Sequence, residues 1–327
     1  MSKPPIIMWF RRDLRTSDHA ALTAACNSGA PVIPVVIRDA SVTDLGAAPK
    51  WRWGLGVSHL AKTLEEKDSR LIMRSGDARD VLQSLIKETG AKSVFWSRLY
   101  DPDAVARDTA IKADLKEQNI DARSFGGHLM FEPWTVETKT GGYYKVYTPM
   151  WRAVKDRDVD APLPAPGRIP APDTWPKSED IADWALGADM QRGADIVRPH
   201  VRLGESAAKS RLGTFIAHRV AHYNEGRDLP ATDGTSGLSE NLALGEISPH
   251  QCWHAGMRAL QEGKGGAETF LKELVWREFA YHLMHHTPRI LDQNWKEDWD
   301  AFPWNTDETS PHVVAWTRGR TGIQFVD

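Results

Sequence analysis

The sequence predicts an α/β fold in which a doubly wound parallel sheet comes first and an all-helical part follows. In the first 130 residues, short apolar runs alternate five times with segments whose apolar residues recur at helical spacing. This alternation is typical of parallel strands joined by right-handed helical crossovers. From residue 204 onward only the helical spacing continues. A chain of 327 residues has room for about two domains of roughly 100–200 residues each.

The predicted elements of the α/β part begin and end at recognisable signals. We expect Ser17 or Asp18 to cap the first helix and Gly29 to end it. Pro34 lies within the second apolar run, where a proline is unfavourable to a strand, whereas Pro102 suits the first turn of a helix. The expected strands are 6–10, 32–37, 70–73, 93–96 and 120–125, and the expected helices are 18–27, 51–67, 77–89 and 102–118.

A change of composition separates the two parts of the chain. Prolines recur between residues 158 and 198, a composition typical of a semi-extended surface linker. We therefore expect an α/β domain over 1–130, an interdomain linker over 131–203 and a helical domain over 204–327. Within the helical domain, apolar spacing predicts helices over 206–223 and 269–286.

Composition and missing motifs exclude several function classes. The net charge of −3 indicates no overall attraction to nucleic acid, so any DNA-binding surface must be a local basic patch. Cys26 and Cys252 stand far apart, which favours a reducing, cytoplasmic compartment without disulfides. No apolar run is long enough to span a membrane. Neither G-x-G-x-x-G nor G-x-x-x-x-G-K-[ST] occurs, so the α/β part lacks the usual signatures of NAD or ATP enzymes.

A cluster of hydroxyl and glycine residues is the main candidate for ligand binding. Residues 234–239 read GTSGLS, so backbone N–H groups and hydroxyl donors are densely packed there. Such donors suit phosphate oxygens, although a plain loop or a helix N-cap accounts for the same pattern. His282, His285 and His286 lack a suitably spaced carboxylate, so we interpret them as helix-surface residues and expect no metal site.

Motifs along the whole chain resemble the photolyase/cryptochrome family of blue-light flavoproteins. They are WFRRDLR at 9–15, LYDP at 99–102, VYTPMW at 146–151, TSGLS at 235–239, GEISP at 245–249, VWREF at 275–279 and AWTRGRTG at 315–322. The resemblance implies a class I cyclobutane pyrimidine dimer photolyase-like chain. The last motif stops at Asp327, where family members continue, so the resemblance also implies C-terminal truncation and an incomplete FAD-binding domain.

The resemblance implies FAD as cofactor and assigns residues to it. The expected cofactor-binding residues are Tyr223, Thr235, Ser236, Gly237, Leu238 and Ser239. Gly237 departs from the family, which usually has a bulkier and often basic residue there. Either pyrophosphate binding is weaker, or another cation substitutes. An antenna chromophore is also expected, methenyltetrahydrofolate ahead of a deazaflavin. Trp51, Trp53 and Tyr100 are candidates to stack on it, although core packing explains them as well.

The resemblance also implies a substrate site for UV-damaged DNA. Glu273 and Trp276 share a helix face, where Glu273 would hydrogen-bond a base edge and Trp276 would stack on the extruded pyrimidine. These two are the expected catalytic residues. The expected DNA contacts are Arg227, Glu273, Trp276 and Arg277; for Arg227, simple solvation is an equal alternative.

The function implied is light-dependent repair of cyclobutane pyrimidine dimers by a deoxyribodipyrimidine photo-lyase. The alternatives are a cryptochrome-like photosensor and an inactive remnant. We expect a monomer that has neither a membrane partner nor an obligate protein partner. The roles of Trp295, Trp299, Trp304 and Trp316, as electron relay or as packing, stay open.

Overall fold

A five-stranded parallel sheet organises the first part of the chain. The computed structural model describes residues 3–327, and its sheet has the strand order β3-β2-β1-β4-β5. The strands are β1 Ile6–Phe10, β2 Val32–Arg38, β3 Ile72–Ser75, β4 Ser93–Ser97 and β5 Asp121–Phe125. The order reverses between β1 and β4, as a doubly wound fold requires. This confirms the predicted α/β class.

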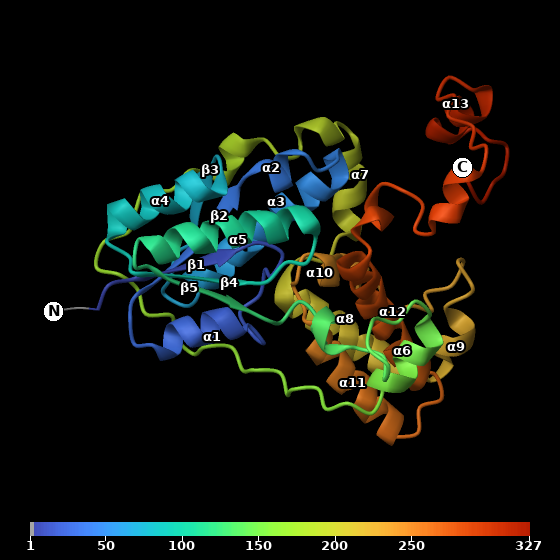
Figure 1. Ribbon diagram of the computed structural model, residues 1–327, viewed down its shortest axis with the longest axis horizontal. Helices are drawn as coiled ribbons and strands as arrows, with labels where there is room; N and C mark the ends of the chain where they lie inside the picture. Colours follow the sequence, from blue (N-terminus) through green and yellow to red (C-terminus); the bar gives the residue numbers. More distant parts are fainter. Residues whose placement is uncertain (1–2) are drawn as a thin grey trace. The chain divides into compact units, whose positions relative to one another are not determined.

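Two apolar cores, one on each face of the sheet, hold this part together. Side chains alternate along β1, so that Met8 faces one core and Trp9 faces the other. Helices α1 (Ala20–Asn27) and α3 (Ala47–Glu65) contribute to the first core. Helices α4 (Ala78–Thr89) and α5 (Pro102–Glu117) contribute to the second core, and in Figure 1 they lie on the other side of the strands from α1. A short helix, α2, spans Ala40–Thr43.

One local expectation needs correction, the cap of the first helix, whereas the strand predicted around Pro34 is present. Helix α1 is capped by His19, whose Nδ1 accepts a hydrogen bond from the Leu22 N–H. Asp18 is unsuited to this role because its φ is +47° and its carboxylate accepts the Leu163 N–H. Pro34 is tolerated in β2 because pairing with β3 begins only at Val35, so no ladder bond to β3 is lost there.

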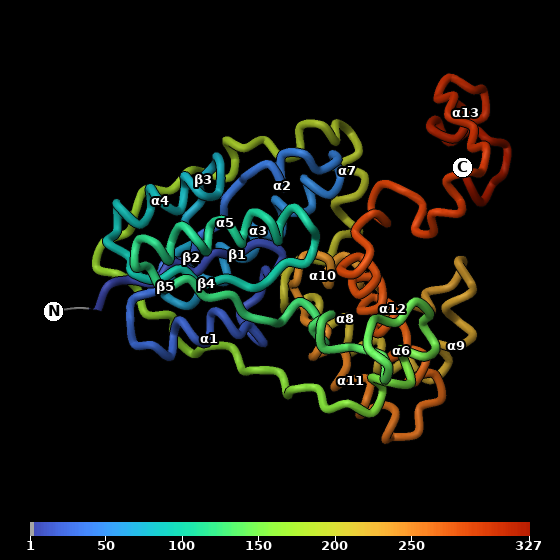
Figure 2. Tube along the Cα trace, in the orientation of Figure 1, coloured from blue at the N-terminus to red at the C-terminus, as the bar shows by residue number. Residues whose placement is uncertain are grey.

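The proline-rich segment runs along the surface of the α/β part. Figure 2 shows the chain after α6 running back past α1 toward the sheet. The Val32 N–H donates to Pro170 O, and Glu179 N–H donates to Met73 O at the edge strand β3. The segment therefore covers an edge that would otherwise expose unpaired backbone groups. Two elements precede this segment, η1 Pro133–Thr135 and α6 Tyr147–Val154. The elements within it and at its end are η2 Ile181–Trp184, η3 Ala188–Met190, α7 Gly193–Val197 and η4 Arg198–His200.

Helices form the rest of the chain, as predicted. They are α8 Gly204–His218, η5 Val220–His222, α9 Tyr223–Gly226, α10 Ser239–Ala243, α11 Pro249–Gln261 and α12 Ala267–His286. One compact unit ends at His286, and a second spans Thr287–Asp327. The second contains η6 Pro288–Leu291, η7 Glu297–Ala301 and α13 Pro311–Thr317. Within residues 3–327, no helix is long and apolar enough to cross a membrane.

Candidate cofactor and substrate site

The GTSGLS segment forms a loop between α9 and α10 whose donors are unused. Leu238 anchors the loop, since it is only 1% exposed. Across residues 3–327, no protein oxygen accepts a hydrogen bond from the backbone N–H groups of residues 235–238. In the same range the hydroxyls of Thr235, Ser236 and Ser239 also have no protein partner. The loop thus offers a concentration of donors suited to an anionic ligand.

Two glycines bring this loop against α9. A Cβ at Gly234 would lie 2.4 Å from the Gly226 carbonyl oxygen, closer than such atoms can approach. The close backbone contact therefore requires a glycine at 234. Because Gly226 ends α9, the contact sets the donor loop beside the helix that carries Tyr223.

An arginine missed by the sequence analysis lies at Gly237. Gly237 has a φ of +62°, and its carbonyl accepts a hydrogen bond from Arg211 of α8. The same Arg211 nitrogen, Nη1, lies 3.0 Å from Glu240 Oε1 and 3.2 Å from Asn241 Oδ1. Arg211 is thus a cation at the position where the loop lacks a basic side chain. Its place in the sequence, in the middle of an ordinary amphipathic helix, gave no signal.

Helix α12 presents Glu273 and Trp276 on its outer side. The helix buries an apolar face that includes Phe270, Leu274 and Val275. Trp276 lies off that face and is 46% exposed. Glu273 forms an ion pair with Arg227, at the end of α9. The predicted shared face of Glu273 and Trp276 is therefore present.

Arg227 links the predicted cofactor residue Tyr223 to the predicted substrate residue Glu273. Its guanidinium carbon lies 5.8 Å from the centre of the Tyr223 ring, which packs against Phe215 and Phe270. The hydrogen bond to Glu273 raises the pKa of Arg227. Burial, and then the nearby Glu273 carboxylate, raise the pKa of Tyr223. The donor loop, α9 and the outer side of α12 thus form one contiguous region.

Arg277 points into the protein. Its guanidinium donates to His128 O at 2.9 Å and lies 3.0 Å from His128 Nε2 and 3.1 Å from Glu278 Oε1. Glu278 is buried and accepts the N–H groups of Met130 and Phe131. Arg277 and Glu278 therefore fasten α12 to the chain leaving the sheet. A DNA contact by Arg277 stays a prediction without support from its position.

Comparison with known proteins gives the family of this chain. Residues 6–167 match the family model DNA photolyase, and residues 270–327 match the FAD binding domain of DNA photolyase. A deoxyribodipyrimidine photo-lyase of Agrobacterium fabrum is 45% identical over 329 residues, which cover 99% of this chain and 67% of that relative. The chain belongs to the DNA photolyase family.

Solved structures support the photolyase fold. The crystal structure of a bacterial class III photolyase from Agrobacterium tumefaciens matches with a TM-score of 0.91 at 43% identity, over 100% of this chain and 68% of that one. Cryptochrome-1 of Arabidopsis thaliana is 30% identical, and the match covers 98% of this chain and 49% of the cryptochrome. The family resemblance is confirmed, and the chain spans about two thirds of the length of the photolyases named here.

The other predicted aromatic residues of this photolyase chain are mostly packed. Trp51, Trp53 and Tyr100 are buried, and Trp53 stacks on Trp184. Their positions favour the packing interpretation over an exposed chromophore platform. Within residues 3–327, no three His, Cys, Asp or Glu side chains are arranged to hold a metal.

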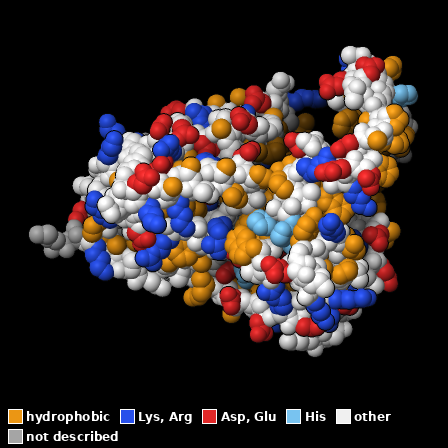
Figure 3. Space-filling model, viewed as in Figure 1, with side chains coloured by type: hydrophobic (Ala, Val, Ile, Leu, Met, Phe, Trp, Pro, Cys, Tyr) orange, Lys and Arg blue, Asp and Glu red, His pale blue; other side chains and the backbone are white. Residues whose placement is uncertain are grey.

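The three histidines of α12 contact one another. His286 lies 4.6 Å from His282 and 4.8 Å from His285 between ring centres. Burial, and then the neighbouring His286, lower the pKa of His282 to about 4, so this ring is neutral at pH 7. Figure 3 shows histidines gathered beside hydrophobic and basic side chains on the face in view.

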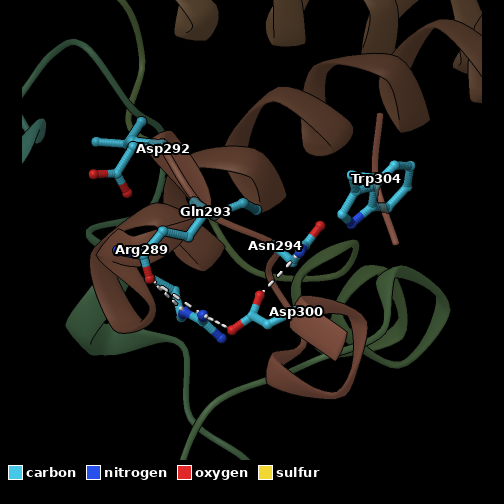
Figure 4. A pocket seen from close by; sticks show the side chains of 8 residues that line it. Arg289, Asp292, Gln293, Asn294, Asp300 and Trp304 are labelled. Atoms are coloured by element: carbon cyan, nitrogen blue, oxygen red, sulfur yellow. Dashed lines mark hydrogen bonds and ion pairs between the residues drawn. The ribbon is translucent and has the colours of Figure 1, made fainter. Parts of the chain in front are cut away.

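A cavity of about 750 Å³, wide open to solvent, lies within the unit Thr287–Asp327. Figure 4 shows Arg289 pointing toward Asp300, with which it pairs at 2.6 Å, while Asn294 donates to the same carboxylate. Trp304 also lines the cavity. Sequence analysis did not identify this cavity, because its residues are separated by irregular chain.

Proposed function

We propose that this chain is a deoxyribodipyrimidine photo-lyase, which repairs cyclobutane pyrimidine dimers in UV-damaged DNA in a light-dependent reaction. The 45% identity to a photolyase over nearly the whole chain supports the enzyme class. The 43% identity to a class III photolyase favours class III over the class I that we expected from sequence. The observation that carries the proposal is the exposed Trp276 ring beside Glu273 on α12.

The residues of the donor loop fit the phosphates of FAD. Unused N–H groups at 235–238 and the nearby hydroxyls would donate to an anionic ligand, and Arg211, which is itself paired with Glu240, would hold the Gly237 peptide in place. The ring of Tyr223 would form one wall of the same site. The chemistry that FAD supplies when bound is a light-driven electron transfer that splits the cyclobutane ring and recovers the electron.

Trp276 and Glu273 would bind the substrate. An extruded pyrimidine offers a flat ring and a polar edge, which suit an indole face and a carboxylate respectively. Arg227 forms an ion pair with Glu273 and so holds this side chain in place before the substrate arrives. Arg227 is then also close enough to the site to contact a DNA phosphate.

Several finer assignments accompany this proposal. The antenna chromophore would be methenyltetrahydrofolate ahead of a deazaflavin, and the chain would act as a monomer on damaged DNA. The α/β domain would span residues 1–130, the interdomain linker 131–203 and the helical domain 204–327. The alternative is a cryptochrome-like photosensor. The identity to Cryptochrome-1 is 30%, whereas the identity to the photo-lyase of Agrobacterium fabrum is 45%, so the comparison favours repair.

The test is a substitution of Trp276 by alanine in the 327-residue chain. Loss of a base–aromatic stack costs on the order of 1–3 kcal/mol, so affinity for an oligonucleotide with one thymine dimer should fall about 5- to 150-fold. Affinity for the undamaged oligonucleotide should change much less. Fluorescence anisotropy with labelled oligonucleotides measures both.

Trp134→Ala provides the matched control, because Trp134 is 47% exposed, close to the 46% of Trp276. This control should leave the preference for damaged DNA unchanged. An equal loss of both affinities in Trp276→Ala would instead assign Trp276 a purely structural role and remove the observation that carries the proposal.

A further inference from the structure

Trp276 has a second aromatic ring stacked on it. Tyr147, the first residue of α6, lies with its ring centre 3.8 Å from that of Trp276, and the two planes are inclined by only 6°. Phe279 stands edge-on to both rings, at 5.9 Å from Tyr147 and 5.7 Å from Trp276. One face of the indole is therefore covered by a parallel ring at van der Waals distance.

A hydrogen bond fixes Tyr147 to the same turn of α12. Its hydroxyl donates to Lys272 O at 2.7 Å. Lys272 stands four residues before Trp276, so this carbonyl belongs to the helical turn that ends at Trp276. Burial, followed by the carboxylates of Glu273 and Glu268, raises the pKa of Tyr147, so the hydroxyl stays protonated and remains a donor at neutral pH.

We propose that Tyr147 is a positioning residue, which closes one face of Trp276 so that an extruded pyrimidine stacks only on the opposite face. This inference rests on the proposed function of Trp276. At 3.8 Å the stack leaves no space for a base between the two rings. Since 46% of Trp276 is exposed, the rest of the indole remains accessible to the substrate.

The stack also limits the rotation of the Trp276 side chain. A free indole would have to be immobilised when the substrate binds, whereas the stacked one is already oriented. Preorganisation of one such side chain corresponds to about a 2- to 10-fold gain in affinity. The gain applies to the extruded dimer, which stacks, and not to undamaged duplex DNA, which does not.

The experiment compares Tyr147→Phe with Tyr147→Ala in the 327-residue chain. Tyr147→Phe keeps the ring and should retain the preference for dimer-containing DNA within about twofold. Tyr147→Ala removes the ring and should reduce this preference about 2- to 10-fold. If the alanine variant fails to fold, as judged by circular dichroism, Tyr147→Leu replaces it, because leucine fills space without offering a flat ring.

A double variant shows whether Tyr147 acts through Trp276. In a Trp276→Ala background, loss of the Tyr147 ring should have no further effect on the preference for damaged DNA. The same loss in both backgrounds would overturn the inference, because Tyr147 would then act only on the fold. An unchanged preference in Tyr147→Ala, together with a loss in Trp276→Ala, would overturn the inference alone. An unchanged preference in Trp276→Ala would overturn the proposed function, and this inference with it.

Discussion

The backbone conformation of Gly237 explains why a glycine stands here in place of a basic residue. It also leaves the Gly237 carbonyl within reach of Arg211. The φ of +62° favours glycine, so a basic side chain at this position would strain the loop by about 1 kcal/mol. Arg211 approaches from α8 and holds the Gly237 carbonyl. Because the carbonyl is held on one side, the following N–H group points to the other side, where a phosphate would accept it.

Loss of Arg211 should therefore weaken FAD binding. The charge-assisted hydrogen bond from Arg211 orders the Gly237 peptide and contributes about 1.5–3 kcal/mol, so a loop without it has to be ordered when FAD binds. Arg211→Ala should therefore raise the dissociation constant for FAD by up to about tenfold. Titration of apoprotein with FAD, followed by flavin fluorescence, measures this. Arg258→Ala, an exposed arginine on α11, should leave the affinity unchanged. If both variants bind FAD equally well, Arg211 does not order the loop.

The two faces of helix α12 have different roles. Its outer face carries Glu273 and Trp276, while Glu278 points inward and accepts the N–H groups of Met130 and Phe131 at 2.9 and 3.2 Å. Burial raises the pKa of Glu278 to about 7, although Arg277 and these N–H groups act in the opposite direction. The inward face thus contains a carboxyl group that titrates near neutral pH.

Glu278 should make stability depend on pH with a defined sign. Its folded pKa of about 7 lies above the ordinary value of 4.5, so the folded state binds the proton more tightly. Its stabilising contribution is fully present below pH 4.5 and is lost as the pH rises through 7. The loss is at most about 3 kcal/mol.

Glu278→Gln, which keeps an acceptor but cannot ionise, isolates this effect. Urea midpoints at pH 5 and pH 8 should show the wild type losing more stability than the variant as the pH rises. Parallel behaviour of the two proteins would mean that Glu278 has an ordinary pKa.

Sequence periodicity was enough to predict most elements, because local spacing determines them. The strand expected at 93–96 is observed as Ser93–Ser97, and the helix expected at 102–118 as Pro102–Glu117. The partners of Arg211, Arg277 and Asp18 are distant in sequence, so their roles could not be predicted from local pattern. The same reason explains the proline-rich segment, whose packing depends on contacts with Val32 and Met73.

In the unit that ends at His286, buried charges join the α/β part to the helical part. Arg52 of α3 donates to both oxygens of Glu246, at 3.0 and 2.6 Å, and to Glu240 at 2.8 Å. Glu246 is fully buried, and its carboxylate also accepts a hydrogen bond from the side-chain amide of Asn241. Glu205 of α8 similarly accepts the N–H groups of Thr16 and Ser17. Because these contacts cross between the parts, we expect both parts to unfold together.

Replacement of Arg52 by methionine tests this coupling. The change leaves the Glu246 carboxylate buried without its cation, which costs about 3–5 kcal/mol. Circular dichroism and tryptophan fluorescence should report one shared urea transition in the wild type and an earlier one in Arg52→Met. The double variant Arg52→Met with Glu246→Leu removes both charges and should recover most of the lost stability, since an apolar pair can replace a buried ion pair. A single variant that loses less than about 1 kcal/mol, or two separate transitions in the wild type, would show that the parts are held together mainly by apolar packing.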